Sequence, residues 1–375
     1  MSMKNPLRRL EDFGQSVWLD YIQCNLLPSA EFRRMIEEDG LKGMTSNPTI
    51  FEKAIDSSRD YDGQFDQLAR TGANVDEIYE ALTTDDIKAA ADALRPIYDK
   101  TDGLDGYVSY EVSPRLANDT AGTLAAAHRY FKLIDRPNLM IKVPSTPAGI
   151  PAIEQLLSEG HNINITLMFS TKHYDTVAEA YIRGLERRAQ AGQPINRIAS
   201  VASVFVSRVE TLVDKRIEEK LKAGGDNGLA ALRGSSAVAG TQLIYERFKE
   251  IFSSDRFKAL AAKGARVQRP LWASTGTKNP AYSDIKYVQD LIGPHTVNTM
   301  PPATMDAYRD HGQPRATVEE NLAEARATVN RLAANGIDLN EVGEELQREG
   351  VDLFIKSFDD LLGAIKKRLS SAAAA

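Results

Sequence analysis

The sequence predicts an α/β fold in which eight parallel strands, each followed by helical sequence, close into one barrel. Eight short apolar or β-rich segments recur along the 375 residues with amphipathic stretches between them, which is the alternation typical of a parallel sheet covered by helices. No Gly-x-Gly-x-x-Gly turn follows the first strand and no P-loop occurs. The pattern therefore favours a single-domain (β/α)8 barrel of the TIM-barrel type, with additional helices, over a doubly wound nucleotide-binding sheet.

Each predicted strand is a short run of apolar and β-branched residues bounded by turn-forming residues. The strands are expected at 16–22, 41–47, 107–112, 139–143, 163–169, 198–205, 270–274 and 296–299.

Between the strands lie amphipathic stretches such as 171–190, 207–222 and 240–252, which predict helices. The polar interval 52–105 is interpreted as helical elaboration of the barrel, with no separate domain. A capping box at Thr317 and Glu320 should begin a helix near the C-terminus.

The last helix should pack across the domain, because its apolar residues form one stripe. These are Val351, Phe354, Ile355, Phe358, Leu361, Leu362, Ile365 and Leu369. The serine- and alanine-rich segment 370–375 is expected to be a frayed tail.

Composition and charge exclude several classes of function. With 42% hydrophobic and 26% charged residues, the chain is typical of a globular protein, and its net charge of −6 argues against a nucleic-acid partner. The sequence has no apolar N-terminal leader and no apolar run of membrane-spanning length, so we expect a cytoplasmic protein with no membrane partner. Helix stripes that cover a barrel resemble those that meet a second subunit, and both monomer and homodimer remain open.

The cysteine and histidine content predicts neither a disulfide nor a metal site. Cys24 is the one cysteine, which excludes an intramolecular disulfide, and it is interpreted as a small buried residue with no catalytic role. No histidine lies at metal-ligand spacing from another, so we expect no metal and no other cofactor. The histidines are His128, His161, His173, His295 and His311.

Polar residues recur on one face of the predicted strands. Because side chains alternate along a strand, Asn164 and Thr166 share one face while Ile163 and Ile165 share the other. In a barrel the isoleucines would pack under helices and the polar face would look inward. The same alternation gives other strands an inner face that carries Asp20, Ser109, Glu111, Lys142, Ser203 and Phe205. Their positions near the C-terminal ends of strands predict one site at the barrel mouth.

Lys142 is the most informative of these residues, since it stands alone in the apolar segment 138–144. Many strand lysines extend from a sheet edge into water, but the accompanying polar set favours a buried functional lysine. A lysine that loses hydration favours its neutral amine, which can attack a carbonyl and form a Schiff base. Asp20 and Glu111 could then move protons. Hydroxyl groups of a polyol could be bound by Asn47, Asn164, Thr166 and Ser203.

Two further positions suggest an anion. Arg208 follows the sixth predicted strand, and the segment from Ser274 to Lys278 follows the seventh, where barrels often hold phosphate on loop amides and a cation. Either cation alone could belong to a solvated helix or loop, but together they favour a sugar phosphate.

An ordered set of motifs resembles the transaldolase family. The motifs are Thr45-Ser-Asn-Pro48, Ser109-Tyr-Glu-Val112, Ile141-Lys142 with Pro144-Ser-Thr146, Asn164-Ile-Thr-Leu167 through Phe169-Ser170, and Ser203-Val-Phe-Val-Ser-Arg208. The resemblance extends from about residue 16 to about residue 299. It implies a metal-free (β/α)8 enzyme of the pentose phosphate pathway that acts on small-molecule sugar phosphates.

The resemblance also implies residue roles. Lys142 matches the Schiff-base lysine that takes a dihydroxyacetone unit from sedoheptulose 7-phosphate or fructose 6-phosphate. Asp20 matches the acid/base at the C4 hydroxyl, and Glu111 with Thr166 matches the pair that handles a water. Asn47, Asn164 and Ser203 match residues that hold the three-carbon unit, and Phe205 matches a residue in the wall of the site. Arg208 and Ser274 match residues that bind the phosphate.

The sequence departs from the family pattern after the seventh strand. Members often carry an arginine shortly after the serine that Ser274 matches, whereas the nearest cation here is Lys278. Ser207 also replaces a glycine common before the arginine. Substrate preference could differ accordingly.

Three alternatives remain beside a transaldolase. A fructose-6-phosphate aldolase would use the same lysine and release free dihydroxyacetone. A sugar-phosphate-binding barrel without catalysis would show damage at Lys142, Asp20 or Glu111, all of which are present. A metal-dependent aldolase would need a cluster of histidines.

Overall fold

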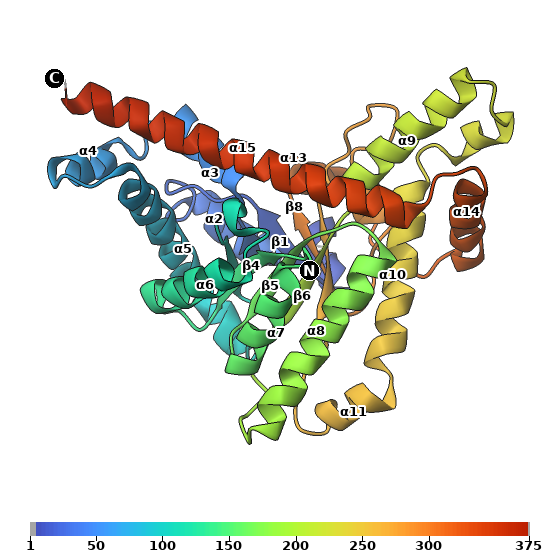
Figure 1. Cartoon of the computed structure of the whole chain (residues 1–375), viewed down its shortest axis with the longest axis horizontal. Helices are drawn as coiled ribbons and strands as arrows, with labels where there is room; N and C mark the ends of the chain where they lie inside the picture. The colour runs from blue at the N-terminus through green and yellow to red at the C-terminus, as the bar shows by residue number, and fades with distance from the viewer. Residues whose placement is uncertain (1–4, 374–375) are drawn as a thin grey trace.

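A computed structural model describes residues 5–373 of the chain, and its centre is a closed barrel of eight parallel strands. The strands follow chain order around the barrel, and β8 pairs with β1 to close it. Figure 1 shows the strands at the centre with helices around them. The expected (β/α)8 fold is confirmed.

All eight predicted strands are present, and their bounds differ from the predictions by only a few residues. They are β1 (Gln15–Asp20), β2 (Leu41–Thr45), β3 (Tyr107–Glu111), β4 (Leu139–Pro144), β5 (Ile163–Met168), β6 (Ser200–Phe205), β7 (Arg269–Ala273) and β8 (Thr296–Met300). Every residue of β3, β4, β5 and β6 is buried, because helices cover the outer face and side chains fill the inside.

The N-terminal end of the barrel is closed by a buried polar cluster. The carboxylate of Asp105 accepts hydrogen bonds from Ser16 Oγ at 2.7 Å and from Trp18 Nε1 at 3.1 Å. Arg269 donates to the same carboxylate at 3.0 Å and to Ser16 Oγ at 2.6 Å. Trp18 lies so close to Gly43 that a Cβ there would meet its ring at 2.4 Å, so only glycine fits. These contacts fill the N-terminal end of the barrel, and the C-terminal end remains available for a functional site.

The longer predicted helices are confirmed. The helices α8 (Thr171–Gln190) and α9 (Ser207–Lys222) have the expected bounds, and α10 (Ser236–Phe252) begins slightly earlier. The remaining connections contain α1 (Pro6–Arg9), η1 (Leu10–Phe13), α2 (Ala30–Arg34), η2 (Met35–Asp39), η3 (Pro114–Leu116), α6 (Thr120–Ile134), α7 (Gly149–Glu159), η4 (Asn227–Leu232), α11 (Asp255–Ala261), α12 (Lys286–Gln289) and α13 (Pro302–His311).

Three helices occupy the long connection between β2 and β3. They are α3 (Pro48–Ser57), α4 (Asp62–Arg70) and α5 (Val75–Lys100). The helix α5 begins with a capping box in which Asn74 and Glu77 each accept from the other's backbone N–H. Inside this layer, Tyr61 Oη donates to the buried carboxyl of Asp86 at 2.7 Å.

Replacing Asp86 with asparagine should reduce the pH dependence of stability. Burial raises the pKa of Asp86 to about 7, although the Tyr61 hydrogen bond opposes the shift. A carboxyl in the unfolded chain titrates near about 4. The folded state therefore binds the proton more tightly, so this stabilisation is present below about pH 4 and is lost as the pH rises through about 7.

Urea denaturation measures the effect. Between about pH 4 and about pH 8, the wild-type chain should lose about 4 kcal/mol of unfolding free energy relative to Asp86→Asn. The exposed neighbour Asp85 is the matched control, and Asp85→Asn should follow the wild type. Parallel curves for wild type and Asp86→Asn would contradict this account.

The expected capping box at Thr317 is wrong. The Thr317 hydroxyl instead donates to Gln289 O at 2.8 Å and accepts from Ile292 N at 3.0 Å. The helix α14 (Leu322–Ala334) begins only after Asn321, which has a left-handed backbone and forms no side-chain cap. The Thr317 hydroxyl therefore forms hydrogen bonds within the connection after α12 and does not cap a helix.

The last helix, α15 (Leu339–Ala373), crosses the domain as expected. It contacts α3, α5 and α9, and Figure 1 shows it running across the molecule to the vicinity of α4. The helix continues through residues 370–373, where the expected fraying stays a prediction, and the rest of 370–375 lies outside the described residues. Within residues 5–373, no helix combines the length and apolarity needed to span a bilayer.

Candidate active site

A cavity of about 280 Å³ opens at the C-terminal ends of the barrel strands. Asp20, Thr45, Phe205 and Ala273 line it, and each is the last residue of its strand. Its other lining residues are Asn47, Thr49, Ile50, Lys53, Lys142, Ser203, Arg208, Ser274, Gly276, Lys278, Thr299, Pro301, Leu353, Phe354 and Ser357. The cavity lies at the end of the barrel where enzymes of this fold bind substrate.

Lys142 is buried in the wall of this cavity. Strand register places Glu111 on one side of it and Asn164 on the other. Its Nζ donates to Ser46 O at 3.1 Å and lies 3.1 Å from Glu111 Oε2. Only the neutral amine of a lysine can attack a carbonyl. The neutral amine expected from the sequence stays a prediction.

Two carboxyl groups flank Lys142, and both have raised pKa values. Burial raises the pKa of Glu111, and the charge of Lys142 partly offsets the shift. Burial also raises the pKa of Asp20, against the charges of Lys142 and Lys278 and a hydrogen bond from Thr45. Thr45 Oγ1 donates to Asp20 Oδ1 at 2.6 Å and lies 2.8 Å from Thr299 Oγ1. A raised pKa suits a carboxyl group to both give and take protons in catalysis.

A buried polar network supports the cavity from behind. Asn164 Nδ2 donates to Ser109 Oγ at 2.9 Å, and its Oδ1 accepts from Ser203 Oγ at 2.6 Å. Thr166 follows on the same face of β5. Among residues 5–373, Thr166 Oγ1 and Glu111 Oε1 have no hydrogen-bond partner, although both atoms are buried. Such groups keep their capacity to bind a polar ligand or a reacting water.

Cations gather at the outer side of the cavity. The guanidinium of Arg208 lies 5.5 Å from the Phe205 ring centroid and 5.8 Å from that of Phe354 in α15. The two rings hold it at the N-terminal turn of α9. Lys278 and Lys53 line the same cavity. Arginine and lysine beside a helix N-terminus form a suitable environment for phosphate.

Ser274 is placed by a tight turn after β7. Its backbone is left-handed, with φ of 54°, and its Oγ lies 2.9 Å from Ser207 Oγ. Ser207 N also donates to Ser274 O at 3.1 Å. These contacts join the turn after β7 to the start of α9, so Ser274 and Arg208 face one cavity.

The structure brings the predicted site residues together. All of them line the cavity except Glu111, Asn164 and Thr166, which lie buried behind Lys142 and Ser203 in neighbouring strands. Lys278 reaches the cavity despite its offset from the family pattern. The sequence interpretation missed several wall residues. These are Thr45, Lys53, Thr299, Leu353, Phe354 and Ser357.

The missed residues differ in whether a sequence pattern could have identified them. Thr45 shares the strand parity of Asn47 and could have been found from that pattern. Leu353, Phe354 and Ser357 come from α15, and no local motif shows that this helix returns to the barrel mouth.

Comparison with known proteins gives the same family throughout the chain. The family model described as transaldolase/fructose-6-phosphate aldolase matches residues 17–365. A protein of Trichodesmium erythraeum named transaldolase is 47% identical over 371 residues, covering 97% of this chain and 98% of the relative.

Two further relatives named transaldolase match over a similar length. The protein of Saccharopolyspora erythraea is 48% identical over 373 residues, covering 99% of this chain and 100% of its own. The protein of Thermobifida fusca is 48% identical over 370 residues, which cover 98% of this chain and 100% of the relative. With a barrel, a buried lysine at its mouth and these matches, the chain belongs to the transaldolase/fructose-6-phosphate aldolase family.

Proposed function

We propose that the cavity at the barrel mouth carries out the transaldolase reaction, with Lys142 as the nucleophile. The chain would be a transferase that moves a dihydroxyacetone unit from sedoheptulose 7-phosphate to glyceraldehyde 3-phosphate, giving erythrose 4-phosphate and fructose 6-phosphate. The observation that carries the proposal is the buried Lys142 amine in β4, 3.1 Å from Glu111 and in the same cavity as Asp20. A coupled assay that follows formation of fructose 6-phosphate tests it.

The proposed chemistry begins with imine formation. The neutral Lys142 amine attacks the ketose carbonyl at C2, which forms a carbinolamine. A proton delivered to the carbinolamine hydroxyl lets it leave as water, and the iminium remains. Glu111 is adjacent to Nζ, and its raised pKa suits it to give and take these protons. Thr166 lies on the neighbouring strand with a buried hydroxyl that can help to hold the water.

Cleavage of the carbon–carbon bond then needs a base at the C4 hydroxyl. Asp20 can take that proton while the C3–C4 electrons move into the iminium, which becomes an enamine as the aldehyde leaves. An acceptor aldehyde reverses the step, and Asp20 returns the proton to the new hydroxyl. Hydrolysis of the imine releases the product and restores the amine. Asn47, Asn164 and Ser203 supply hydrogen-bonding groups for the retained three-carbon unit.

Arg208 should determine affinity for the substrate phosphate. Arg208→Met should raise KM for phosphorylated donors by about 10- to 100-fold, because a hydrogen bond to a charged group contributes about 1.5–3 kcal/mol. Steady-state kinetics with fructose 6-phosphate and with fructose separates this effect from general damage, because KM should rise for fructose 6-phosphate and not for fructose.

Arg115→Met is the matched control. Arg115 also lies over a phenylalanine of α15, 5.3 Å from the Phe358 ring centroid, but does not line the cavity. An equal change in both variants, or none in either, would contradict a phosphate role for Arg208.

The family description includes a second activity, fructose-6-phosphate aldolase, which would use the same lysine. An aldolase would protonate the enamine and release free dihydroxyacetone, whereas a transaldolase retains it until an aldehyde arrives. Incubation with fructose 6-phosphate without an acceptor separates the two. Rapid release of dihydroxyacetone would overturn the transferase proposal, and release only at the background rate supports it.

We further propose that this reaction serves the pentose phosphate pathway in the cytoplasm. The proposal rests on membership of the family and on the cations that face the cavity. Deletion of the gene should make cells accumulate sedoheptulose 7-phosphate. An unchanged level, with no second transaldolase expressed, would overturn this assignment.

A further inference from the structure

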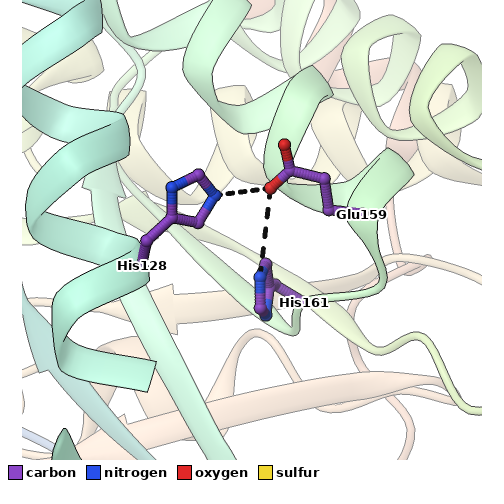
Figure 2. Close-up of side chains that lie close together, drawn as sticks. All are labelled: His128, Glu159 and His161. Atoms are coloured by element: carbon purple, nitrogen blue, oxygen red, sulfur yellow. Dashed lines mark hydrogen bonds and ion pairs between the residues drawn. The ribbon is translucent and has the colours of Figure 1, made fainter. Parts of the chain in front are cut away.

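His128, Glu159 and His161 form a cluster outside the barrel mouth. One ligand atom of each residue lies within 4.8 Å of the others. Figure 2 shows both imidazoles directed at one carboxylate, with Glu159 Oε2 2.5 Å from His128 Nε2 and 3.9 Å from His161 Nε2. No two histidines lie at metal-ligand spacing in the sequence, but the packing of α6 against α7 brings His128 close to Glu159.

The cluster lies at the end of the barrel opposite the cavity. His128 belongs to α6, Glu159 is the last residue of α7, and His161 stands just before β5 begins. Gly160, with φ of 103°, turns the chain between Glu159 and His161. The three side chains therefore come from neighbouring elements and lie near the N-terminal ends of the strands, away from Lys142.

Surrounding contacts orient two of the three groups. Glu159 Oε1 accepts from Gln155 Nε2 at 2.6 Å, and Gln155 Oε1 in turn accepts from Arg187 at 2.7 Å. The His161 ring stacks on Phe131 with centroids 4.1 Å apart and an angle of 11°. Hydrogen bonds that orient a ligand from behind are typical of metal sites.

We propose that His128, Glu159 and His161 bind one divalent transition-metal ion, with Zn²⁺ as the best fit. Two imidazoles and a carboxylate, with solvent at the remaining position, form an established ligand set for zinc, and imidazole also suits Cu²⁺ and Ni²⁺. Zinc bonds of about 2.0–2.1 Å in a tetrahedron separate ligand atoms by about 3.4 Å. The distances from Glu159 Oε2 to the two imidazole nitrogens lie on either side of that value, and all three side chains are exposed enough to adjust.

The bound ion would join α6 to the connection between α7 and β5. Its expected effect is stabilisation of the folded chain, since a ligand that binds only the folded state raises its stability. Transfer activity should not depend on it, because the site lies at the other end of the barrel. A surface ion-pair cluster without metal affinity is the competing interpretation.

Isothermal titration of the tag-free full chain with ZnCl₂, after chelator treatment and dialysis, tests the proposal. We expect saturable binding at one site per chain and a rise in the melting temperature with zinc. His128→Gln and His161→Gln should each weaken binding at least about tenfold, and Gln155→Ala about tenfold through its orienting hydrogen bond. All three positions are on the surface, and circular dichroism checks that each variant is folded.

His311→Gln is the matched control. His311 is likewise an exposed histidine, and it lies between the carboxylates of Asp284 and Asp310. Its replacement should leave the zinc affinity unchanged. No saturable binding up to millimolar zinc, or binding that persists unchanged in both His128→Gln and His161→Gln, would overturn the proposal.

Discussion

Lys142→Met should reduce the transfer rate by about 10⁴-fold or more, the scale of loss when a covalent nucleophile is removed. Methionine matches the four-atom apolar stem of lysine but has no amine, so no imine can form. The Glu111 carboxyl would lose its charged partner at 3.1 Å, and its raised pKa should rise further. Steady-state transfer between fructose 6-phosphate and erythrose 4-phosphate measures the loss.

Lys172→Met is the control for this variant. Lys172 is exposed on α8 and pairs with Glu344 at 2.8 Å, outside the cavity. It should retain wild-type kinetics. If Lys142→Met kept a substantial fraction of the wild-type rate while folded, the lysine could not be the nucleophile.

Asp20→Asn should lower kcat by about 10²- to 10⁴-fold, the range for loss of a general acid or base. Asparagine can still accept the Thr45 hydrogen bond at 2.6 Å, so the local geometry should persist. Because Lys142 and Glu111 remain, imine formation with the donor should continue. The variant should therefore be trapped by borohydride with fructose 6-phosphate and yet fail to transfer the three-carbon unit.

The paired readout makes this prediction specific. Asp284→Asn replaces an exposed carboxylate that does not line the cavity and should leave both trapping and transfer unchanged. Loss of trapping in Asp20→Asn would instead place Asp20 in imine formation. Full transfer would remove it from the mechanism.

The barrel could be predicted because its strands carry a strong local signal. In β5, for example, Ile163 and Ile165 alternate with Asn164 and Thr166, and that parity distinguishes an outer apolar face from an inner polar one. The same parity identified Lys142 and Glu111, whose register in neighbouring strands then brought them together. Resemblance to the family supplied the roles of these residues.

The remaining features depend on contacts between distant segments. Phe354 reaches Arg208 only because α15 crosses back to the barrel mouth, and no motif near either residue indicates this. The hydroxyl of Thr317 serves Gln289 and Ile292 through tertiary contacts, which override its local capping pattern.

Trapping of the imine tests the central claim most directly. Reduction of the chain by borohydride with fructose 6-phosphate, followed by peptide mapping, should give one three-carbon adduct per chain, on Lys142. An adduct on another lysine, or full inactivation without any adduct, would contradict the proposed mechanism.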